Sequence, residues 1–343
     1  MGRRPILSLL GALALAAACA GPAATPTPAP TPAPTAAPTP TPTVAPPTSL
    51  VIGFVPSREA SALVETIQPI ADYLSQKLGI PVTGYVSTDY TAMVTALSSG
   101  QAQIAALAPF TIIQAIDEAG AELILQSERF GSGTYHTQFM TNNPDLYCTI
   151  SPPVENQRES SINPGTFLNC NGTDRGPSDT PEGPIGTEVL ANVPAGTTVS
   201  FVEESSASGY IFPVTILQNA GINTDTGIEK LFAGAHDASA IAVCNGDAEV
   251  GVSFDDARSE ATSECDLGEV VVFAYGDEIP NDGIVVSGDL PETKKAAIKQ
   301  ALLDYAATAD GATVLKTVYN ITAFAEPNLD ALLIVRDAAA NLQ

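Results

Sequence analysis

The sequence predicts an α/β protein built as two lobes, and three observations lead to that prediction. Between residues 50 and 126, apolar runs of strand length alternate with segments whose apolar residues recur at helical spacing. The same alternation resumes at residue 197, after a stretch from 143 to 195 that breaks it. Residues 50–343 are enough for one large two-lobed domain or for two small ones. Strands that alternate with helices favour mostly parallel sheets, with ligands bound in the crevice at the carboxyl ends of the strands.

The first lobe begins with a buried strand over 50–55, which ends at Pro56 and Ser57. Gly79 supplies the C-cap of the helix that follows. One apolar face of that helix is formed by Leu63, Ile67, Ile70, Leu74 and Leu78. The pattern then predicts, in order, a strand at 81–86, a helix at 91–99, a strand at 103–107, a helix at 109–120 and a strand at 121–126.

Residues 143–195 are rich in Pro, Gly, Asn and Ser, and they contain Cys148 and Cys170. A structureless loop of this length is uncommon in a compact domain, so we expect an inserted loop region stapled by a disulfide between these cysteines. Cys244 and Cys265 form the second sequential pair, the simplest of three possible connectivities. Zinc needs closer clustering of Cys and His than this chain offers, so we expect no metal site.

The second run of alternating elements predicts a strand at 197–202, helices at 208–220 and 238–245, a strand at 249–253 and a helix that starts at Asp255. A strand at 270–274 then leads back to the first lobe, where a helix begins near 289–292 with an early proline and acidic residues. We therefore assign residues 50–142 with 275–343 to lobe 1, residues 143–195 to the insertion and residues 196–274 to lobe 2.

The first 19 residues predict export and anchoring. Arg3 and Arg4 precede an apolar run at 6–18 that suits a signal peptide and is too short for a permanent membrane span. Small residues lead directly to Cys19, and residues 15–19 resemble a bacterial lipobox, in which the cysteine is acylated. An ordinary cleavage site with an incidental cysteine is the alternative. We expect a lipoprotein signal peptide at 1–19 and a protein anchored to the cell membrane by lipid, in the periplasm or at the cell surface.

Residues 20–49 contain 11 prolines and no charged residue, a composition that predicts an extended, disordered linker. All 38 acidic residues of the chain follow residue 49, whereas two of the 14 basic residues precede it. This balance excludes nucleic acid and anionic membrane surfaces as binding partners. Any anionic ligand must therefore be bound by local dipoles against an unfavourable overall field.

Residues 203–210, between a predicted strand and a predicted helix, carry the clearest candidate site. Ser206 and Ser208 are two residues apart, and Gly209 follows them. At a helix N-terminus, free backbone N–H groups, the helix dipole and serine hydroxyls converge on one point, an arrangement that favours an oxyanion. A plain serine N-cap is the alternative for this stretch alone.

Four segments, at 53–90, 205–213, 233–251 and 279–286, together resemble the phosphonate/phosphite-type periplasmic binding proteins, which are solute receptors of ABC importers. The resemblance covers residues 50–140 and 196–310. It implies the type II periplasmic-binding-protein fold, in which two α/β lobes are joined by a hinge and enclose a ligand cleft. It also implies a monomeric binding protein that uses no cofactor and is not an enzyme.

The resemblance further implies an anion site made by Tyr90, Tyr135, Ser206, Ala207, Ser208, Gly209, Tyr210, His236 and Asp255, the segment 207–210 contributing backbone amides. The family often has a hydroxyl residue where Ala207 stands, so one contact is missing here. Weaker candidates are Ser57, Pro109, Phe110, Ser205 and Asp256. Asp256 aligns as well as Asp255 does, and the glycine that normally precedes the family's proline is absent before Pro109.

Tyrosine and serine are neutral donors, which suits them to a desolvated oxyanion. A carboxylate at Asp255 selects ligands that keep a proton, as a phosphonate or phosphite monoanion does and a sulfonate does not. We therefore expect capture of a phosphorus oxyanion by hinge closure and delivery to an ABC transporter permease. The alternatives are a receptor for a membrane signalling partner, a ferric-ion-binding protein that uses the tyrosines with His236 and Asp255, and a hydrolase, which would lack the Gly-x-Ser-x-Gly elbow.

Overall fold

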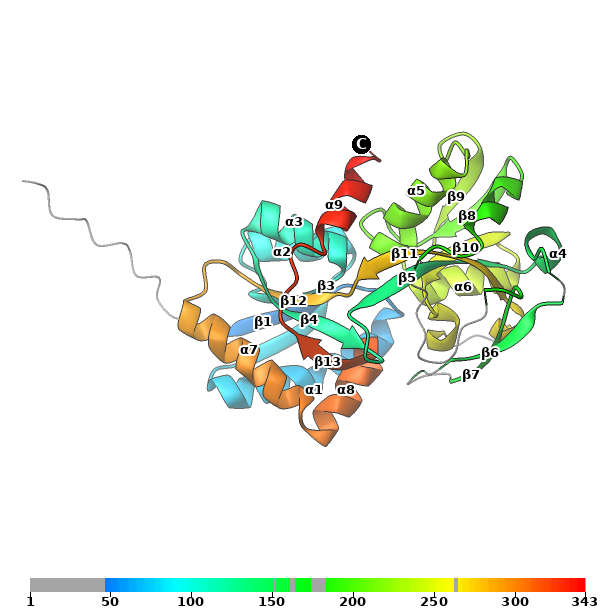
Figure 1. The fold of residues 1–343 in the computed structure, drawn as a ribbon. Coiled ribbons are helices and arrows are strands. Elements are labelled where there is room, and N and C mark those ends of the chain that lie inside the picture. Colours follow the sequence, from blue (N-terminus) through cyan, green and yellow to red (C-terminus); the bar gives the residue numbers. More distant parts are fainter. Residues whose placement is uncertain are drawn as a thin grey trace, which may run out of the picture. The chain divides into compact units, whose positions relative to one another are not determined.

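The computed structural model describes residues 47–150, 152–158, 160, 164–173, 183–261 and 265–342. Two sheets with their helices form two α/β lobes in this part of the chain, which confirms the expected class (Figure 1). The expected signal peptide, Cys19 and most of the expected linker lie outside the described residues. Among the described helices, none combines the length and the apolar character that a membrane span requires.

The first sheet has six strands in the order β13-β4-β12-β3-β1-β2. They are β1 (Leu50–Phe54), β2 (Val82–Val86), β3 (Ile104–Leu107), β4 (Glu122–Arg129), β12 (Gly283–Val286) and β13 (Ile321–Ala325). β1 pairs in parallel with β2 and β3, whereas β12 runs antiparallel to β3 and β4. β1, β3 and β12 are largely buried, which is why they read in the sequence as continuous apolar runs.

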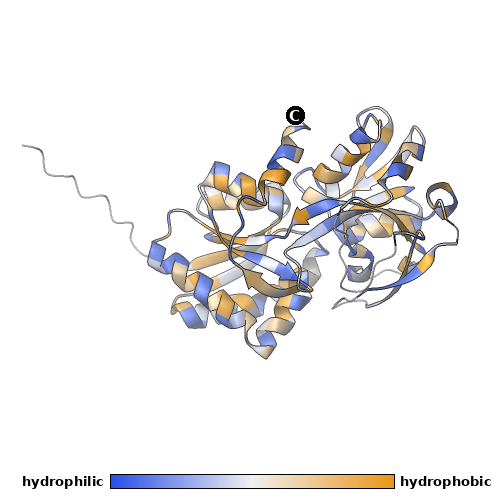
Figure 2. Cartoon of the chain, in the orientation of Figure 1, coloured by the Kyte–Doolittle hydropathy of each residue, from blue (hydrophilic) through white to orange (hydrophobic). Residues whose placement is uncertain are grey.

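The helices of this lobe are α1 (Ala60–Leu78), α2 (Tyr90–Ser98), α3 (Pro109–Ala119), α7 (Glu292–Ala306), α8 (Ala309–Tyr319) and α9 (Leu333–Ala340). The buried apolar face of α1 is formed by Leu63, Ile67, Ile70 and Leu74, which pack in one core with residues of α7 and α8. Hydrophilic and hydrophobic positions accordingly alternate along these helices (Figure 2). The helices and strands expected over 50–126 are confirmed with small shifts at their ends.

The second sheet has seven strands in the order β6-β7-β11-β5-β10-β8-β9. They are β5 (Thr134–Thr141), β6 (Val154–Arg158), β7 (Gly165–Asn169), β8 (Thr197–Phe201), β9 (Ile228–Phe232), β10 (Val250–Phe254) and β11 (Val271–Pro280). β8 pairs in parallel with β9 and β10, and β5 runs antiparallel to β10 and β11. The helices are α4 (Pro144–Tyr147), α5 (Phe212–Asn219) and α6 (His236–Asn245), with 3₁₀ turns at Thr187–Asn192, Ala257–Glu260 and Leu267–Glu269.

The boundaries of the lobes differ from the expected ones. β5 belongs to the second sheet, so the chain leaves the first lobe between Arg129 and Thr134 rather than near residue 142. It returns after Pro280 rather than near residue 274, because β11 continues along β5. The sequence gives no sign of β5, because His136, Thr137 and Gln138 are polar residues that are nevertheless fully buried.

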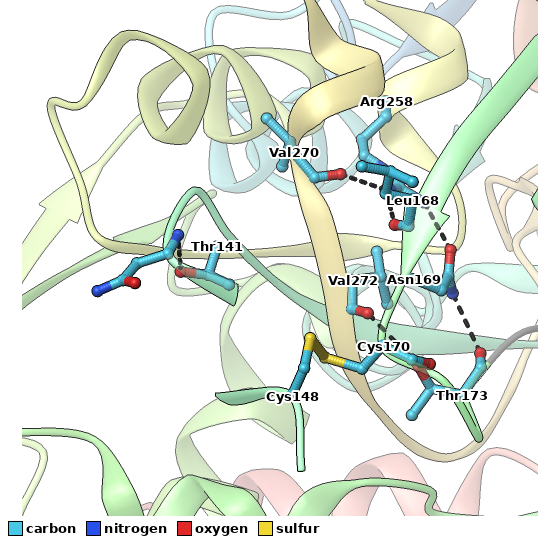
Figure 3. The surroundings of a disulfide bond; sticks show 10 residues. Thr141, Cys148, Leu168, Asn169, Cys170, Thr173, Arg258, Val270 and Val272 are labelled. Atoms are coloured by element: carbon cyan, nitrogen blue, oxygen red, sulfur yellow. Dashed lines mark hydrogen bonds between the residues drawn. A yellow bond between two sulfur atoms is a disulfide. The ribbon is translucent and has the colours of Figure 1, made fainter. Parts of the chain in front are cut away.

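Residues 143–195 contribute the edge of the second sheet, not only a loop. β6 and β7 form an antiparallel hairpin, and β7 joins β11 through the pairing of Asn169 with Val272. Both expected disulfides are present, Cys148–Cys170 and Cys244–Cys265. The first joins the end of α4 to the end of β7, where the Cys170 amide donates to the Val272 carbonyl at 2.8 Å (Figure 3).

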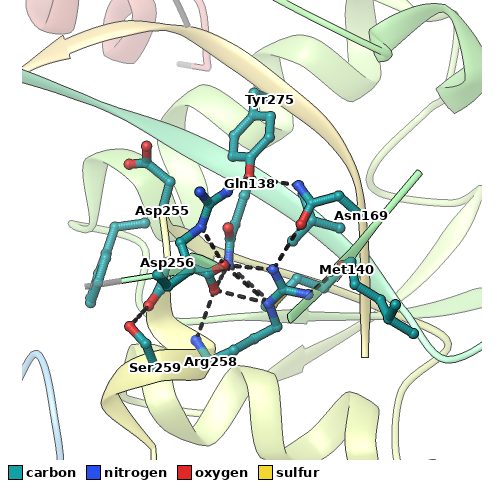
Figure 4. A network of polar contacts seen from close by, with 12 residues as sticks. Gln138, Met140, Asn169, Asp255, Asp256, Arg258, Ser259 and Tyr275 are labelled. Atoms are coloured by element: carbon teal, nitrogen blue, oxygen red, sulfur yellow. Dashed lines mark hydrogen bonds and ion pairs between the residues drawn. The ribbon is translucent and has the colours of Figure 1, made fainter. Parts of the chain in front are cut away.

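A second difference concerns the segment after β10. We expected an α-helix that starts at Asp255, but a 3₁₀ turn forms at Ala257–Glu260 with Asp256 as its N-cap. The cause is Arg258, whose buried guanidinium Nη1 donates to the Leu168 carbonyl at 2.6 Å and to the Val270 carbonyl. Its Nη2 lies 2.6 Å from Oδ2 of Asp256 (Figure 4). These contacts hold the turn against β7 and the start of β11.

We expect Arg258→Met to lower the free energy of unfolding by about 3–5 kcal/mol, because the substitution leaves two carbonyls and part of a carboxylate buried without their donors. Urea denaturation followed by circular dichroism measures the change. The matched control is Lys299→Met, which breaks an ion pair with the exposed Glu326 (2.7 Å) and should cost less than about 1 kcal/mol. Equal losses in the two variants would contradict the structural role given to Arg258.

Candidate ligand-binding site

A cavity of about 90 Å³ lies among residues of both lobes. From the first lobe it is lined by Ser57 after β1, Tyr90 at the start of α2, and Arg129 at the end of β4. The second lobe lines it with Tyr135 of β5, Ser206, Ser208, His236 at the start of α6, and Asp255 after β10. Ser57, Tyr90, the two serines, His236 and Asp255 follow the carboxyl ends of strands that pair in parallel, where open α/β sheets bind ligands, whereas Arg129 and Tyr135 lie on the antiparallel strands β4 and β5.

The turn between β8 and α5 is a π-helical turn, Ala207–Ile211, which replaces the expected regular start of a helix. Ser206 is its N-cap, and its Oγ accepts from the Gly209 amide at 3.1 Å. The Ser206 carbonyl accepts from the Tyr210 amide. Of the amides at 207–210, those of Ala207 and Ser208 are the two without an acceptor among the described residues, and Ser208 also lines the cavity.

Gly209 is required by close packing in this turn. A Cβ at this position would lie 2.4 Å from the Val202 side chain and 2.8 Å from Ser206 Oγ. Both distances are shorter than real Cβ contacts allow, so any larger residue would displace the serine that caps the turn. Gly209 therefore shapes the cradle, although its own amide is already bonded.

Four side-chain hydroxyls meet at this end of the cavity. Ser206, Ser208 and Tyr90 are each 1% exposed, and Tyr135 is 6% exposed. Burial raises the pKa of both tyrosines above the ordinary value, which keeps their phenols protonated. A hydrogen bond from Ser208 partly offsets the rise for Tyr135. All four groups are therefore neutral donors at physiological pH.

His236 presents a defined tautomer to the cavity. The Phe254 amide donates to its Nδ1 at 3.2 Å, so the imidazole proton must reside on Nε2. Nε2 lies 3.4 Å from Ser206 Oγ. Burial lowers the pKa of His236 to about 3, and the Arg129 charge acts in the same direction. His236 is therefore a neutral Nε2–H donor.

The two adjacent acids have different surroundings. The Asp256 carboxylate forms ion pairs with Arg258 and with Arg158, whose Nε lies 3.2 Å from Oδ2. It also accepts a hydrogen bond from Gln138 Nε2 at 3.1 Å. Burial alone would raise the pKa of the Asp256 carboxyl, but these guanidiniums hold it well below its ordinary value. Asp255 points away from this network (Figure 4). Its Oδ1 accepts from the His136 amide at 2.9 Å.

Several lining residues carried no sequence signal. Arg129 forms an ion pair with Asp282, and its guanidinium lies 5.6 Å from the Tyr135 ring centroid. Burial raises the pKa of the Asp282 carboxyl, an effect that Arg129 opposes. Further lining residues are Arg58, Phe130, Arg158, Phe254, Glu260, Tyr319 and Asn320. Most of them are brought together from distant parts of the chain, so no local spacing marks them.

Other candidates from the sequence, Ala207 and Gly209 among them, are not among the residues that line the cavity, whereas Asp256 is. The Tyr210 side chain points away, with its ring against Phe201 and Phe232 and its hydroxyl 3.3 Å from Lys230 Nζ. In the described part of the chain, Pro109 and Phe110 are not among the lining residues. Ser205 lies outside, where its Oγ is 3.4 Å from Thr91 Oγ1.

Comparison with known proteins identifies the family of this chain. The family described as ABC transporter, phosphonate, periplasmic substrate-binding protein matches residues 52–332. The phosphate-import protein PhnD of Mycolicibacterium smegmatis is 24% identical over 221 residues, which is 61% of this chain but only 56% of that relative's length.

Solved structures show the same fold at low identity. A binding protein component of an ABC phosphonate transporter from Pseudomonas aeruginosa has a TM-score of 0.67 at 18% identity, over 84% of this chain and 85% of that one. PhnD1 from Prochlorococcus marinus, solved in complex with methylphosphonate, has a TM-score of 0.68 at 17% identity, over 86% of this chain and 98% of that one. This confirms the two-lobed fold of periplasmic binding proteins.

Such proteins work outside the cytoplasm as the receptors of importers and are not enzymes. The family match extends over both lobes and includes every strand from β2 to β13. The chain therefore belongs to the periplasmic substrate-binding proteins of phosphonate ABC transporters.

Proposed function

We propose that this protein captures a phosphorus oxyanion, which is a phosphonate, phosphite or phosphate, by closure of its two lobes and delivers it to an ABC importer. Lipid attached at Cys19 and the proline-rich linker would keep the binding unit within reach of the permease. The relative from Mycolicibacterium smegmatis is a phosphate-import protein, and the neighbour from Prochlorococcus marinus holds methylphosphonate. Both support this class of ligand.

The observation that carries the proposal is the set of neutral donors around one cavity. The Ser206 and Ser208 hydroxyls, the Ala207 and Ser208 amides, the Tyr90 and Tyr135 phenols and the His236 Nε2–H all come from elements that border it. Preorganised neutral dipoles bind a desolvated anion without a cation of their own. Such recognition suits a chain whose net charge is −24.

Asp255 supplies the selection among oxyanions. Its carboxylate borders the cavity without an arginine partner among the described residues. A fully deprotonated anion beside it would be repelled, whereas a ligand with a P–OH group donates a hydrogen bond to it. Phosphate-type groups have a second pKa of about 6, so a protonated fraction persists at neutral pH. Sulfonates have no such proton.

The contacts also weigh against the other functions. A serine hydrolase needs the histidine to accept the serine proton, but the Phe254 amide on Nδ1 leaves Nε2 protonated beside Ser206. Ferric iron binds tyrosine as phenolate, and burial raises the pKa of Tyr90 and Tyr135. A sensing receptor would use the same pocket, and it differs from an importer subunit in its partner.

We expect Ser208→Ala and Tyr90→Phe each to weaken the binding of methylphosphonate by about 1–3 kcal/mol, since each removes a buried donor. Isothermal titration calorimetry measures the loss. Tyr85→Phe is the matched control, because Tyr85 is partly buried in the first lobe and is not among the residues that line the cavity. Wild-type affinity in both cavity variants would contradict the site.

We expect the ring resonances of His236 to stay constant between pH 8 and 5, because its pKa in the folded protein is about 3. The unfolded value is about 6.5, so the neutral ring stabilises the fold fully above that pH and this contribution declines as the pH falls toward 3. Proton NMR measures the titration, with a His236→Asn variant to assign the resonance. A midpoint between pH 6 and 7 would contradict the neutral donor.

A further inference from the structure

A buried ion pair joins the two lobes at one wall of the cavity. Arg58, in the loop after β1, donates from Nη1 to Glu260 Oε2 at 2.6 Å. Asn320, which follows α8, donates to the other oxygen, Oε1, also at 2.6 Å. Arg58 and Asn320 belong to the first lobe and Glu260 to the second, and all three border the cavity.

Each half of this contact is fixed within its own lobe. Arg58 Nη2 donates to the Thr317 carbonyl at 2.7 Å and to the Val318 carbonyl, which are carbonyls of the last turn of α8. Asn320 caps the same helix with φ of 56°, a conformation that asparagine tolerates. On the other side, Ser160 Oγ lies 2.9 Å from Glu260 Oε1 and 2.7 Å from the Ser259 carbonyl.

The balance of free energies favours a stabilising role for this contact. A buried ion pair compensates for its lost hydration only when its geometry is good and further hydrogen bonds satisfy the charges. Glu260 meets that condition, because Arg58 and Asn320 each donate to one oxygen of its carboxylate, whose side chain is 1% exposed. Ser160 Oγ also lies beside Oε1, although it shares its one proton with the Ser259 carbonyl. Contacts within the first lobe orient Arg58, and Ser160 of the second lobe lies beside Glu260, so closure would immobilise few rotamers.

We propose that Arg58, Asn320 and Glu260 form a latch across the lobes that sets how long the closed protein retains its ligand. This inference rests on the proposed capture by lobe closure. It also assigns a role to the segment 143–195, because this segment supplies Ser160, whose Oγ lies within hydrogen-bond distance of Glu260. Opening the lobes breaks the contacts of Glu260 with its two partners in the first lobe. The free energy that this step requires slows the release of the ligand.

Glu260→Gln tests the latch, because it removes the negative charge of the side chain and keeps its shape. We expect Glu260→Gln to raise the dissociation rate constant of methylphosphonate about tenfold or more while the association rate constant changes little, since loss of one partner of a buried charge pair acts mainly on dissociation. Stopped-flow fluorescence measures both constants. The control is Glu122→Gln, which removes an ion pair with Lys295 (2.8 Å) inside the first lobe and should leave both constants unchanged.

Hydrogen exchange gives a second measurement that needs no ligand. Three amides donate across the lobes at 3.1 Å, from Glu59 to Asp237, from Tyr90 to Glu203 and from His236 to Ser57. In the absence of ligand, Glu260→Gln should accelerate exchange at these amides and leave the amides of β1 and β3 as in the wild type. A merely structural role of Glu260 would instead change exchange throughout the second lobe.

Different results would overturn the latch and the proposed class of ligand. Unchanged exchange at the three amides in Glu260→Gln, or a wild-type dissociation rate constant, overturns the latch. If the wild-type protein binds neither methylphosphonate nor inorganic phosphate, the proposed ligand class fails, and the exchange measurement alone decides on the latch.

Discussion

Charge compensation is the constraint on which the cavity depends. Buried charges are tolerated only when they are paired, and this chain has far more acids than bases. Three arginines line the cavity, and each is held by a carboxylate, Arg58 by Glu260, Arg129 by Asp282 and Arg158 by Asp256. Their charges are therefore balanced within the protein, and the neutral donors that border the cavity are hydroxyls, amides and one imidazole N–H. A site of this kind can bind an anion inside a strongly acidic protein.

The same constraint assigns opposite roles to adjacent residues. Asp256 is drawn toward Arg258 and Arg158 and becomes part of the frame that joins β7, β11 and the 3₁₀ turn. Asp255 is left at the cavity wall, oriented by the His136 amide of β5. β5 thus connects the site to the fold, because it pairs with both β10 and β11 and also carries Tyr135.

Much of this organisation follows from the sequence. Apolar runs and helical spacing predict most elements of the first lobe, and the serine pair before Gly209 marks the turn whose two serines line the cavity. β5 escapes prediction because its buried residues include His136, Thr137 and Gln138, whose polarity hides their position in the centre of a sheet. The three arginines at the cavity could not be predicted because their acidic partners are distant in the sequence, as Glu260 is from Arg58. The choice between Asp255 and Asp256 depends on side-chain direction, which sequence alone does not contain.

The central claim is that neutral donors and one carboxylate select protonated phosphorus oxyanions. Isothermal titration of methylphosphonate and methanesulfonate against the wild-type protein and Asp255→Asn tests it most directly. We expect the wild type to bind methylphosphonate at least about tenfold more tightly than methanesulfonate, and Asp255→Asn to remove most of this preference by weakening the repulsion of the sulfonate. Equal affinity of the wild type for the two ligands, or a preference that survives in Asp255→Asn, would contradict it.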